Sequence, residues 1–499
     1  MSEHQISRDE AGENLLNCAA YLAETIKSAD GHAEALKEIV PRFLAKDNVD
    51  LAAGLADTIE DPFSRDLLLT LVAEKCAAID DDEYAFQLIE AVEDYGNQLR
   101  AREKVALVKA TKGDLEKAFE IAENLEHPDE VFAEVAFREA VRGDEADALE
   151  TLEEIEFPYT KSTALQNIAQ FYIKNDDKPK AVKFLDSAKK EAENIEFIEE
   201  QIRAFVEIGN GFLAAKENGK AIETFDRAKT ITENLDNVHR DSFFADISLG
   251  FLYAGSLDLA DRTLDLVSDK TQMVTALLGF SQHFHAKDEF ADALESLEEA
   301  YAILKSQKDL EIRDSRMRYR LWTACAILFA KYGKEERAIE IASEIPEEQT
   351  QMSSLRQIAE VFAAQGKDEF SAQAVKAIDD EGYKMLAFIG MSDAKKELEA
   401  NEEAIKNLND AHYHAGLVDR LGLRSEGFND IAKRFFELGE KDKSREICTE
   451  NLEIIKEIKD DSLRASALTN LSDLYDEAGF ELQDADREIL QAIVRKAES

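Results

Sequence analysis

A helix-hairpin pattern recurs along almost the whole 499-residue chain and limits what the chain can fold into. Its clearest repeat is residues 317–346, where Trp322 and Phe329 fall on one helix face. Gly333 then makes a turn, and a second short helix ends before Pro346. One such hairpin cannot bury its own apolar face and needs copies of itself as neighbours. We therefore predict an all-α fold built from stacked hairpins.

Thirteen turn residues keep one register along the chain. The residue eight positions before the turn is apolar in all thirteen, and the residue after that one is small in twelve. Five positions after the turn, ten residues are alanine and two are serine, which lets the second helix approach the first without overpacking. The predicted turns are Asp47, Asp80, Gly113, Gly143, Asp176, Lys216, Gly255, Asp288, Gly333, Gly366, Glu399, Gly439 and Gly479.

The two ends of the pattern predict caps. Ser7 and Glu10 have capping-box spacing, so residues 1–30 are predicted to hold an N-terminal capping helix. Residues 31–483 form the repeat array, and residues 484–499 form a C-terminal capping helix with an apolar inner side. Asp484 breaks the small-residue rule, and we interpret it as the end of the array, where nothing stacks on top.

The register resembles that of the tetratricopeptide repeat (TPR) family over roughly residues 31–484. The third and eleventh repeats depart from it, with Lys109 and Lys395 at the position that is aromatic in most of the others. The resemblance implies a right-handed superhelical solenoid of about thirteen antiparallel helix pairs. It also implies that the first helix of each pair lines a concave groove that holds a peptide or protein segment. The matching residues are Trp322, Cys325, Ala326, Phe329, Gly333, Lys334 and Ala338.

The charge balance narrows the class of partner. Asp and Glu number 106 against 60 Lys and Arg, which gives a net charge of −46. Such a surface repels nucleic-acid phosphates and anionic lipid heads, so neither nucleic acid nor membrane is a predicted partner. The acidity is either a solvated exterior or an adaptation to high salt, and both interpretations remain open. Four widely spaced cysteines and a polar, acidic opening segment favour a reducing cytoplasm.

No sequence motif predicts catalysis. We find no phosphate-binding glycine loop, no nucleophile elbow and no metal-ligand spacing. The histidine pairs His283/His285 and His412/His414 lie two residues apart, which on a helix directs the two rings roughly 200° apart. We therefore predict a non-enzymatic protein with no metal site and no cofactor.

The groove predicted from the resemblance has three zones. The first offers small or apolar groups, namely Ala77, Leu107, Ala110, Ala133, Phe137 and Ala140. The last is acidic, with Asp393, Glu397, Glu426, Glu437, Asp473, Asp476 and Glu477. The middle zone is the predicted partner-binding site, because amides, arginines and a tyrosine can hydrogen-bond a polypeptide. Its residues are Gln166, Gln170, Lys174, Arg203, Asn210, Leu249, Tyr253, Gln282, His285, Arg320 and Arg356.

A basic run over residues 305–320 lies beside this zone. It either neutralises adjacent acidic helices or forms a docking patch for an acidic partner. The predicted function is a protein-interaction scaffold that binds a partner segment in its groove. Two alternatives are an acidic decoy that occupies a basic protein and a structural protein that self-assembles through its exposed end. The oligomeric state stays open.

The net charge predicts how salt affects stability. Screening of self-repulsion in a chain of charge −46 should raise its melting temperature as NaCl is added. Calorimetric melting curves at low and high NaCl measure this directly. A melting temperature that falls with added salt would contradict the self-repulsion argument.

Overall fold

The computed structural model describes residues 5–306 and 314–497, and within these ranges every regular element is an α-helix. The chain divides into two compact units. Unit 1 contains residues 1–105 and 351–499, and unit 2 contains residues 106–350. The all-α prediction is confirmed.

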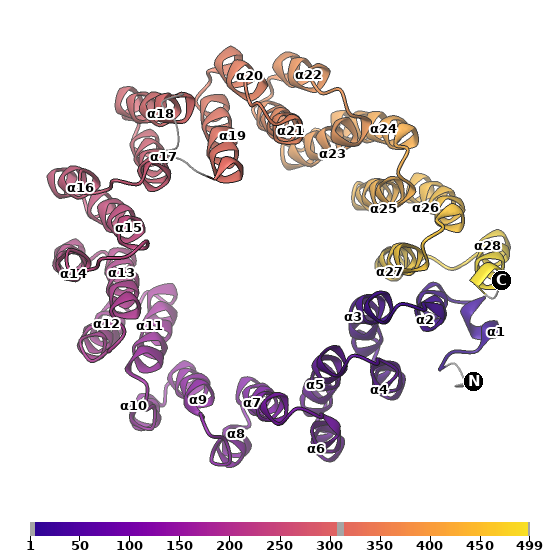
Figure 1. The fold of residues 1–499 in the computed structure, drawn as a ribbon, viewed down its shortest axis with the longest axis horizontal. Coiled ribbons are helices and arrows are strands. Elements are labelled where there is room, and N and C mark those ends of the chain that lie inside the picture. Colours follow the sequence, from indigo (N-terminus) through magenta and orange to yellow (C-terminus); the bar gives the residue numbers. More distant parts are fainter. Residues whose placement is uncertain (1–4, 307–313, 498–499) are drawn as a thin grey trace. The chain divides into compact units, whose positions relative to one another are not determined.

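Unit 1 contains both ends of the chain (Figure 1). Its helices up to residue 105 are α1 (Arg8–Ala11), α2 (Leu15–Thr25), α3 (Ala29–Ala45), α4 (Val49–Asp57), α5 (Pro62–Ala78), α6 (Asp82–Ala91) and the first part of α7 (Tyr95–Lys112). Its later helices are α21 (Glu348–Ala364) from residue 351 onward, α22 (Asp368–Lys376), α23 (Glu381–Glu397), α24 (Asn401–Leu417), α25 (Leu421–Glu437), α26 (Lys441–Glu457), α27 (Asp461–Ala478) and α28 (Asp484–Ala497).

Unit 2 continues the same alternation of helices. It contains the remainder of α7 and the helices α8 (Leu115–Ala122), α9 (Asp129–Arg142), α10 (Glu145–Glu153), α11 (Pro158–Lys174), α12 (Lys178–Ala192), α13 (Ile198–Ala214), α14 (Asn218–Thr232), α15 (Arg240–Tyr253), α16 (Leu257–Leu264), α17 (Lys270–Ala286), α18 (Phe290–Lys305), α19 (Ser315–Lys331) and α20 (Glu335–Ser343).

The turns of the hairpins share one backbone conformation. All thirteen predicted turn residues have positive φ, from 57° to 65° at the six that are not glycine and from 65° to 95° at the seven glycines. A residue in this left-handed region ends a helix and redirects the chain. The register therefore locates the turns to the residue.

The core follows the same register. Every residue eight positions before a turn is buried, and Met391 is the most exposed of them at 7%. The small residues five positions after the turn are fully buried in the first twelve repeats. In the repeat around Gly333, the Trp322 indole donates a hydrogen bond to the Ile341 carbonyl at 3.1 Å, which joins the two helices of that hairpin.

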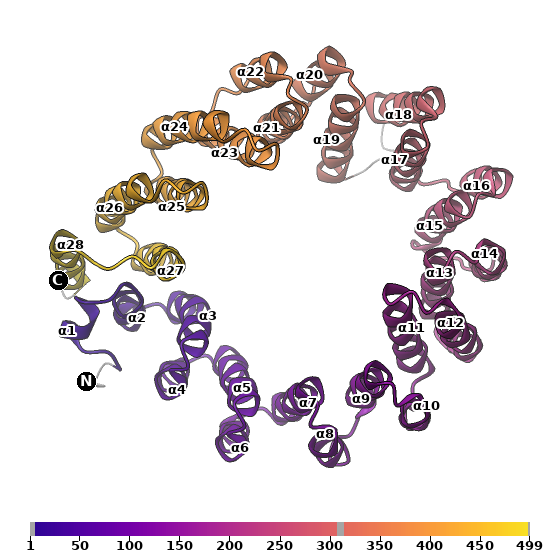
Figure 2. The same cartoon turned by 180° about the vertical axis from the view of Figure 1, so that it is seen from behind.

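The ends of the chain correct the prediction of two separate caps. The N-terminal helix α2 packs against α27 and α3, as Figures 1 and 2 both show. Within the array, α24 packs in the same way between α23 and α25. Helix α2 therefore serves as the second helix of the hairpin that α27 begins. The expectation that nothing stacks on the last repeat is wrong.

This closure explains the exception at Asp484. The helix that follows it, α28, packs on α26, α2 and α1. The partner position beside α27 is occupied by α2, whose residues Ala19, Ala20 and Ala23 are fully buried. The small residues that a close helix contact requires are therefore supplied from the other end of the chain. The inward residues predicted for α28, among them Leu490 and Ile493, are buried as expected.

The N-terminal segment itself is shorter and more broken than predicted. The capping box between Ser7 and Glu10 is present, but it opens a helix of only four residues. The chain bends at Gly12, and the Asn14 side chain caps α2 by accepting a hydrogen bond from the Asn17 amide at 3.0 Å. The segment therefore forms two helices, the second with its own side-chain cap, instead of the single continuous helix expected there.

Polar contacts also join the two ends of the chain within unit 1. Arg42 of α3 pairs with Asp473 of α27 at 3.1 Å, and Lys46 pairs with Asp476 at 2.6 Å. The Ser466 hydroxyl donates a hydrogen bond to Glu38 at 2.7 Å. These groups are partly exposed and contribute little stability, so they fix the register of a contact that the buried apolar residues stabilise.

The turn geometry predicts opposite effects of two glycine substitutions. An added Cβ meets no atom within 4 Å at Gly366, where φ is +71°, or at Gly219, which lies inside α14. Gly366→Ala should destabilise the fold by about 1–2 kcal/mol, since the left-handed conformation is strained for alanine. Gly219→Ala should stabilise the fold by about 0.4–1 kcal/mol, because alanine lowers the conformational entropy of the unfolded chain. Melting temperatures that move in the same direction for both variants would contradict the turn assignment.

Candidate functional site

Four of the predicted partner-binding residues line one cavity in unit 2. Arg203 and Asn210 of α13 lie opposite Leu249 and Tyr253 of α15, around a space of about 490 Å³. Both helices are the first helices of their hairpins, as predicted for a groove. Tyr253 is 46% exposed and packs on His283 with ring centroids 5.3 Å apart. Tyrosine and arginine are among the residue types that most often dominate protein interfaces.

Two carboxylates on the walls of the same cavity have raised pKa values. Burial raises the pKa of Asp246 on α15. Burial also raises the pKa of Glu207 on α13, although the nearby Arg203 guanidinium opposes this effect. Glu199, a third wall residue, accepts a hydrogen bond from the Asn237 amide at 2.5 Å. The cavity therefore combines one guanidinium, an amide and a phenol with partly desolvated acids.

Two more predicted residues line a second cavity in unit 2. Gln170 and Lys174 of α11 face Phe137 of α9 across a space of about 400 Å³. The Phe137 ring meets Phe171 edge-on, with centroids 6.2 Å apart. Phe137, which the sequence analysis placed in the apolar zone, lines this cavity together with Leu107 and Ala133.

Other predicted residues are not brought to either cavity. Gln166 donates a hydrogen bond to Ser162 within its own helix at 3.5 Å, and His285 stacks on Tyr332 with centroids 4.0 Å apart. Gln282 and Arg320 are exposed on α17 and α19. Arg356 lies in unit 1 and pairs with Glu360 one turn away on α21. In the apolar zone, Ala77, Ala110 and Ala140 are wrong as groove residues, because all three are buried.

Two residues of the basic run over residues 305–320 form contacts within the protein. Lys305 pairs with Glu344 at 2.8 Å, and Arg318 donates hydrogen bonds to the carbonyls of Leu304 and Ser306. Residues 307–313 of this run lie outside the described residues. The contacts that are described favour the neutralising role of the run over a docking patch.

Several residues of the predicted acidic zone carry internal partners. Asp393 pairs with Arg434 at 2.8 Å, and Glu437 pairs with Lys396 at 2.7 Å. Glu477 pairs with Lys433 at 2.8 Å. Asp473 and Asp476 pair with Arg42 and Lys46 near the N-terminus. Much of this acidic surface is therefore neutralised within unit 1.

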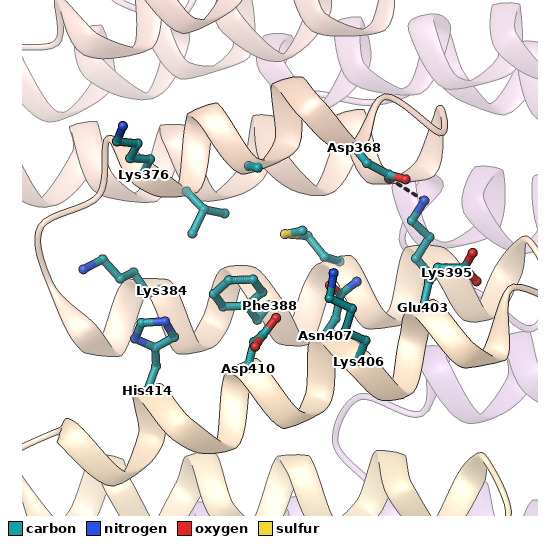
Figure 3. A pocket seen from close by; sticks show the side chains of 13 residues that line it. Asp368, Lys376, Lys384, Phe388, Lys395, Glu403, Lys406, Asn407, Asp410 and His414 are labelled. Carbon is teal, nitrogen blue, oxygen red and sulfur yellow. Dashed lines mark ion pairs between the residues drawn. The ribbon is translucent and has the colours of Figure 1, made fainter.

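A further cavity lies in unit 1 and was not predicted from the sequence. The α22–α24 cavity has a volume of about 550 Å³ and lies between two second helices, with α23 forming its floor (Figure 3). Phe388 and Met391 of α23 and Val375 of α22 supply apolar surface. Its charged lining residues are Asp368, Lys376, Lys384, Lys395, Glu403, Lys406 and Asp410.

Some of these charged groups are fixed by partners. Lys395 of α23 pairs with Asp368 at 2.5 Å (Figure 3). Glu381, at the start of α23, accepts a hydrogen bond from Lys384 at 2.9 Å and lies 2.5 Å from the His414 ring nitrogen. The Lys384 ammonium and His414 hold the pKa of the Glu381 carboxyl below its usual range. His414 in turn stacks on Phe388, with centroids 5.4 Å apart.

One sequence signal did mark this region. Lys395 occupies the position that is aromatic in most repeats, and from the sequence alone this indicates only a departure from the repeat pattern. In the structure its side chain is 8% exposed and forms one wall of the α22–α24 cavity. A smaller difference is helix length, since α22 has nine residues and α24 has seventeen.

The histidine pairs behave as their spacing predicts. His412 bonds to Glu450 at 2.9 Å, whereas His414 bonds to Glu381 on a different helix. Within the described ranges, no three His, Cys, Asp or Glu side chains gather as a metal site. All four cysteines are buried free thiols, and burial raises the pKa of Cys325 to about 12. No described helix is both long and apolar enough to cross a membrane.

The lowered pKa of Glu381 gives a testable pH dependence. A carboxylate with a depressed folded pKa stabilises the fold above its unfolded pKa, and this contribution disappears as the pH falls through the folded value. Glu381→Gln should therefore lower the melting temperature near neutral pH and have a shrinking effect as the pH is lowered. Glu403→Gln, which removes a cavity carboxylate without an ion pair among the described residues, is the control. A Glu381→Gln effect that does not change with pH would contradict this account.

Comparison with known proteins adds little beyond the fold. No protein-family model matches the chain, and no curated protein matches it. Solved structures with some likeness include the apo form of RapI, at 14% identity over 73% of this chain and 97% of that chain, with a TM-score of 0.31. Aspartyl phosphate phosphatase F from Bacillus subtilis aligns at 12% identity over 87% and 96%, with a TM-score of 0.29. The apo quorum sensor NprR from B. thuringiensis aligns at 11% identity over 72% and 100%, with a TM-score of 0.26. Likenesses this weak carry no argument about binding or activity, and the helical-repeat architecture is established by the chain's own hairpins.

Proposed function

We propose that this protein is a non-enzymatic scaffold that binds a segment of a partner polypeptide along the first helices of unit 2. The observation that carries the proposal is the cavity between α13 and α15. It brings together Arg203, Asn210, Leu249 and Tyr253, four residues that the resemblance to the TPR family places in a binding groove. Neither nucleic acid nor membrane is part of the proposal.

The chemistry of this cavity suits an extended polypeptide. The Asn210 amide both donates and accepts hydrogen bonds, as a peptide backbone requires. The Arg203 guanidinium can hold a carboxylate or a carbonyl in a forked contact. Leu249 and Tyr253 supply apolar area for a side chain of the segment. The second cavity, with Gln170 and Lys174 beside Phe137, offers a similar mixture on α9 and α11.

A double variant tests the groove directly. Peptides selected from a display library against the full-length protein should bind the Arg203→Glu/Tyr253→Ala variant at least about 30-fold more weakly, since an Arg or Tyr at the centre of an interface typically contributes about 2 kcal/mol. Calorimetric titration measures the affinities, and circular dichroism checks that the variant is folded.

The matched control is Arg262→Glu/Tyr95→Ala. Arg262 lies on α16 with its side chain 69% exposed, and Tyr95 is 64% exposed at the start of α7. Selected peptides should bind this control as they bind the wild type. If no peptide is selected, or if both double variants lose binding equally, the groove is not the binding site.

Salt dependence separates the scaffold from the acidic decoy. A decoy attracts basic proteins through exposed charge, so its binding should collapse as salt is added and should not respond to the groove variant. Binding in the groove should depend weakly on salt and strongly on Arg203 and Tyr253. The remaining alternative, self-assembly through an exposed end, loses its basis because α2 covers α27.

A further inference from the structure

The Asn407 side chain in the α22–α24 cavity lacks a partner. Asn407 of α24 is 8% exposed, and its amide lines the cavity near Lys406 (Figure 3). Among the described residues, no hydrogen bond reaches this amide. The Asn407 amide is not among the fully enclosed side-chain groups without a partner, so it reaches solvent through the cavity. A group that enters the cavity can take the place of that water and bond to the amide.

Two lysines of the cavity also lack ion pairs. Lys376 at the end of α22 and Lys406 on α24 have no carboxylate within ion-pair distance in the part of the chain that the structure describes. Glu403 and Asp410 lie about one turn on either side of Lys406, yet neither pairs with it. Both lysines are exposed residues, and their ammonium groups come from opposite walls of one cavity. They mark a place where one negative charge would be stabilised.

The rest of the cavity suits an apolar body. Phe388, Met391 and Val375 line it, and Met391 and Val375 are themselves almost fully buried. A volume of about 550 Å³ is within the usual range for small-molecule sites. A ligand of this size could cover the apolar surface with its body while its polar end reaches Asn407 and Lys406.

We propose that the α22–α24 cavity binds a small organic acid, a single carboxylate carried on an apolar body. One carboxylate oxygen accepts a hydrogen bond from the Asn407 amide, and the other meets the ammonium of Lys406 or Lys376. A single charge fits better than a phosphate, because Glu403 and Asp410 repel a second negative charge. This site belongs to unit 1 and is independent of the groove proposed above.

Three probes of the same shape and different charge test the site. They are 3-phenylpropionate, its neutral amide 3-phenylpropanamide, and the cation 3-phenylpropylamine. Calorimetric titration into the full-length protein should show saturable binding of the acid, at least about tenfold tighter than the amide and tighter still than the amine. Equal affinity for acid and amide would show that the cavity recognises only the apolar body and would overturn the proposal. A preference for the amine, or no saturable binding of the acid, would overturn it too.

Point variants locate the binding. Lys406→Met and Asn407→Leu should each weaken 3-phenylpropionate binding about tenfold or more, and Lys406→Met should also narrow the preference for the acid over the amine. Lys287→Met, which removes an exposed lysine of unit 2 without a partner among the described residues, should change nothing. Equal loss in Lys287→Met would show non-specific charge attraction. If Asn407→Leu does not fold, Lys406→Met and the three probes still decide the proposal.

Discussion

Each helix pair in this protein exposes an apolar face on both sides, and every such face must be covered by another helix. Inside the array the next hairpin does this, with small residues at the contact and a left-handed turn that returns the chain. At the last hairpin no further repeat follows, and the N-terminal helix α2 covers α27 instead. The stability of the C-terminal repeat therefore depends on residues more than four hundred positions earlier in the chain.

This dependence changes how the ends should be interpreted. A solenoid with two polar caps frays from its ends, because each terminal repeat has only one neighbour. Here α2 has the same kind of neighbours as an internal second helix, and the fully buried Leu22 and Cys18 lie on it. Local opening should be easier elsewhere, for example where the shorter second helices α10, α16 and α22 cover less of the first helices.

The repeat register predicted much of the fold. It located all thirteen turns and the buried positions around them, because one periodic constraint acts on every hairpin. It failed at α27, because the register follows the sequence and the partner helix α2 comes from the distant N-terminus. Asp484, which breaks the small-residue rule, is the visible sign of that failure.

The candidate sites were predicted less well for a similar reason. Arg203 and Tyr253 line one cavity because they lie on neighbouring first helices, which the register can place. The α22–α24 cavity depends on unequal helix lengths and on the side chains of Lys406 and Asn407, which belong to second helices. Periodicity fixes which face of such a helix is buried, but not whether two helices separate enough to leave a cavity between them.

Zero-length carbodiimide cross-linking tests the closure of the chain ends most directly. The Lys46 Nζ atom and an Asp476 carboxylate oxygen lie 2.6 Å apart. An Asp476 carboxylate activated by the carbodiimide should therefore form an amide with Lys46, which peptide mass spectrometry detects. The local pair Lys396 and Glu437, 2.7 Å apart, is the internal standard, and mixing labelled with unlabelled protein separates links within one chain from links between chains. The closure predicts a Lys46–Asp476 link within single chains. If the local link forms and the Lys46–Asp476 link is absent, or occurs only between chains, α2 does not complete the last hairpin of its own chain.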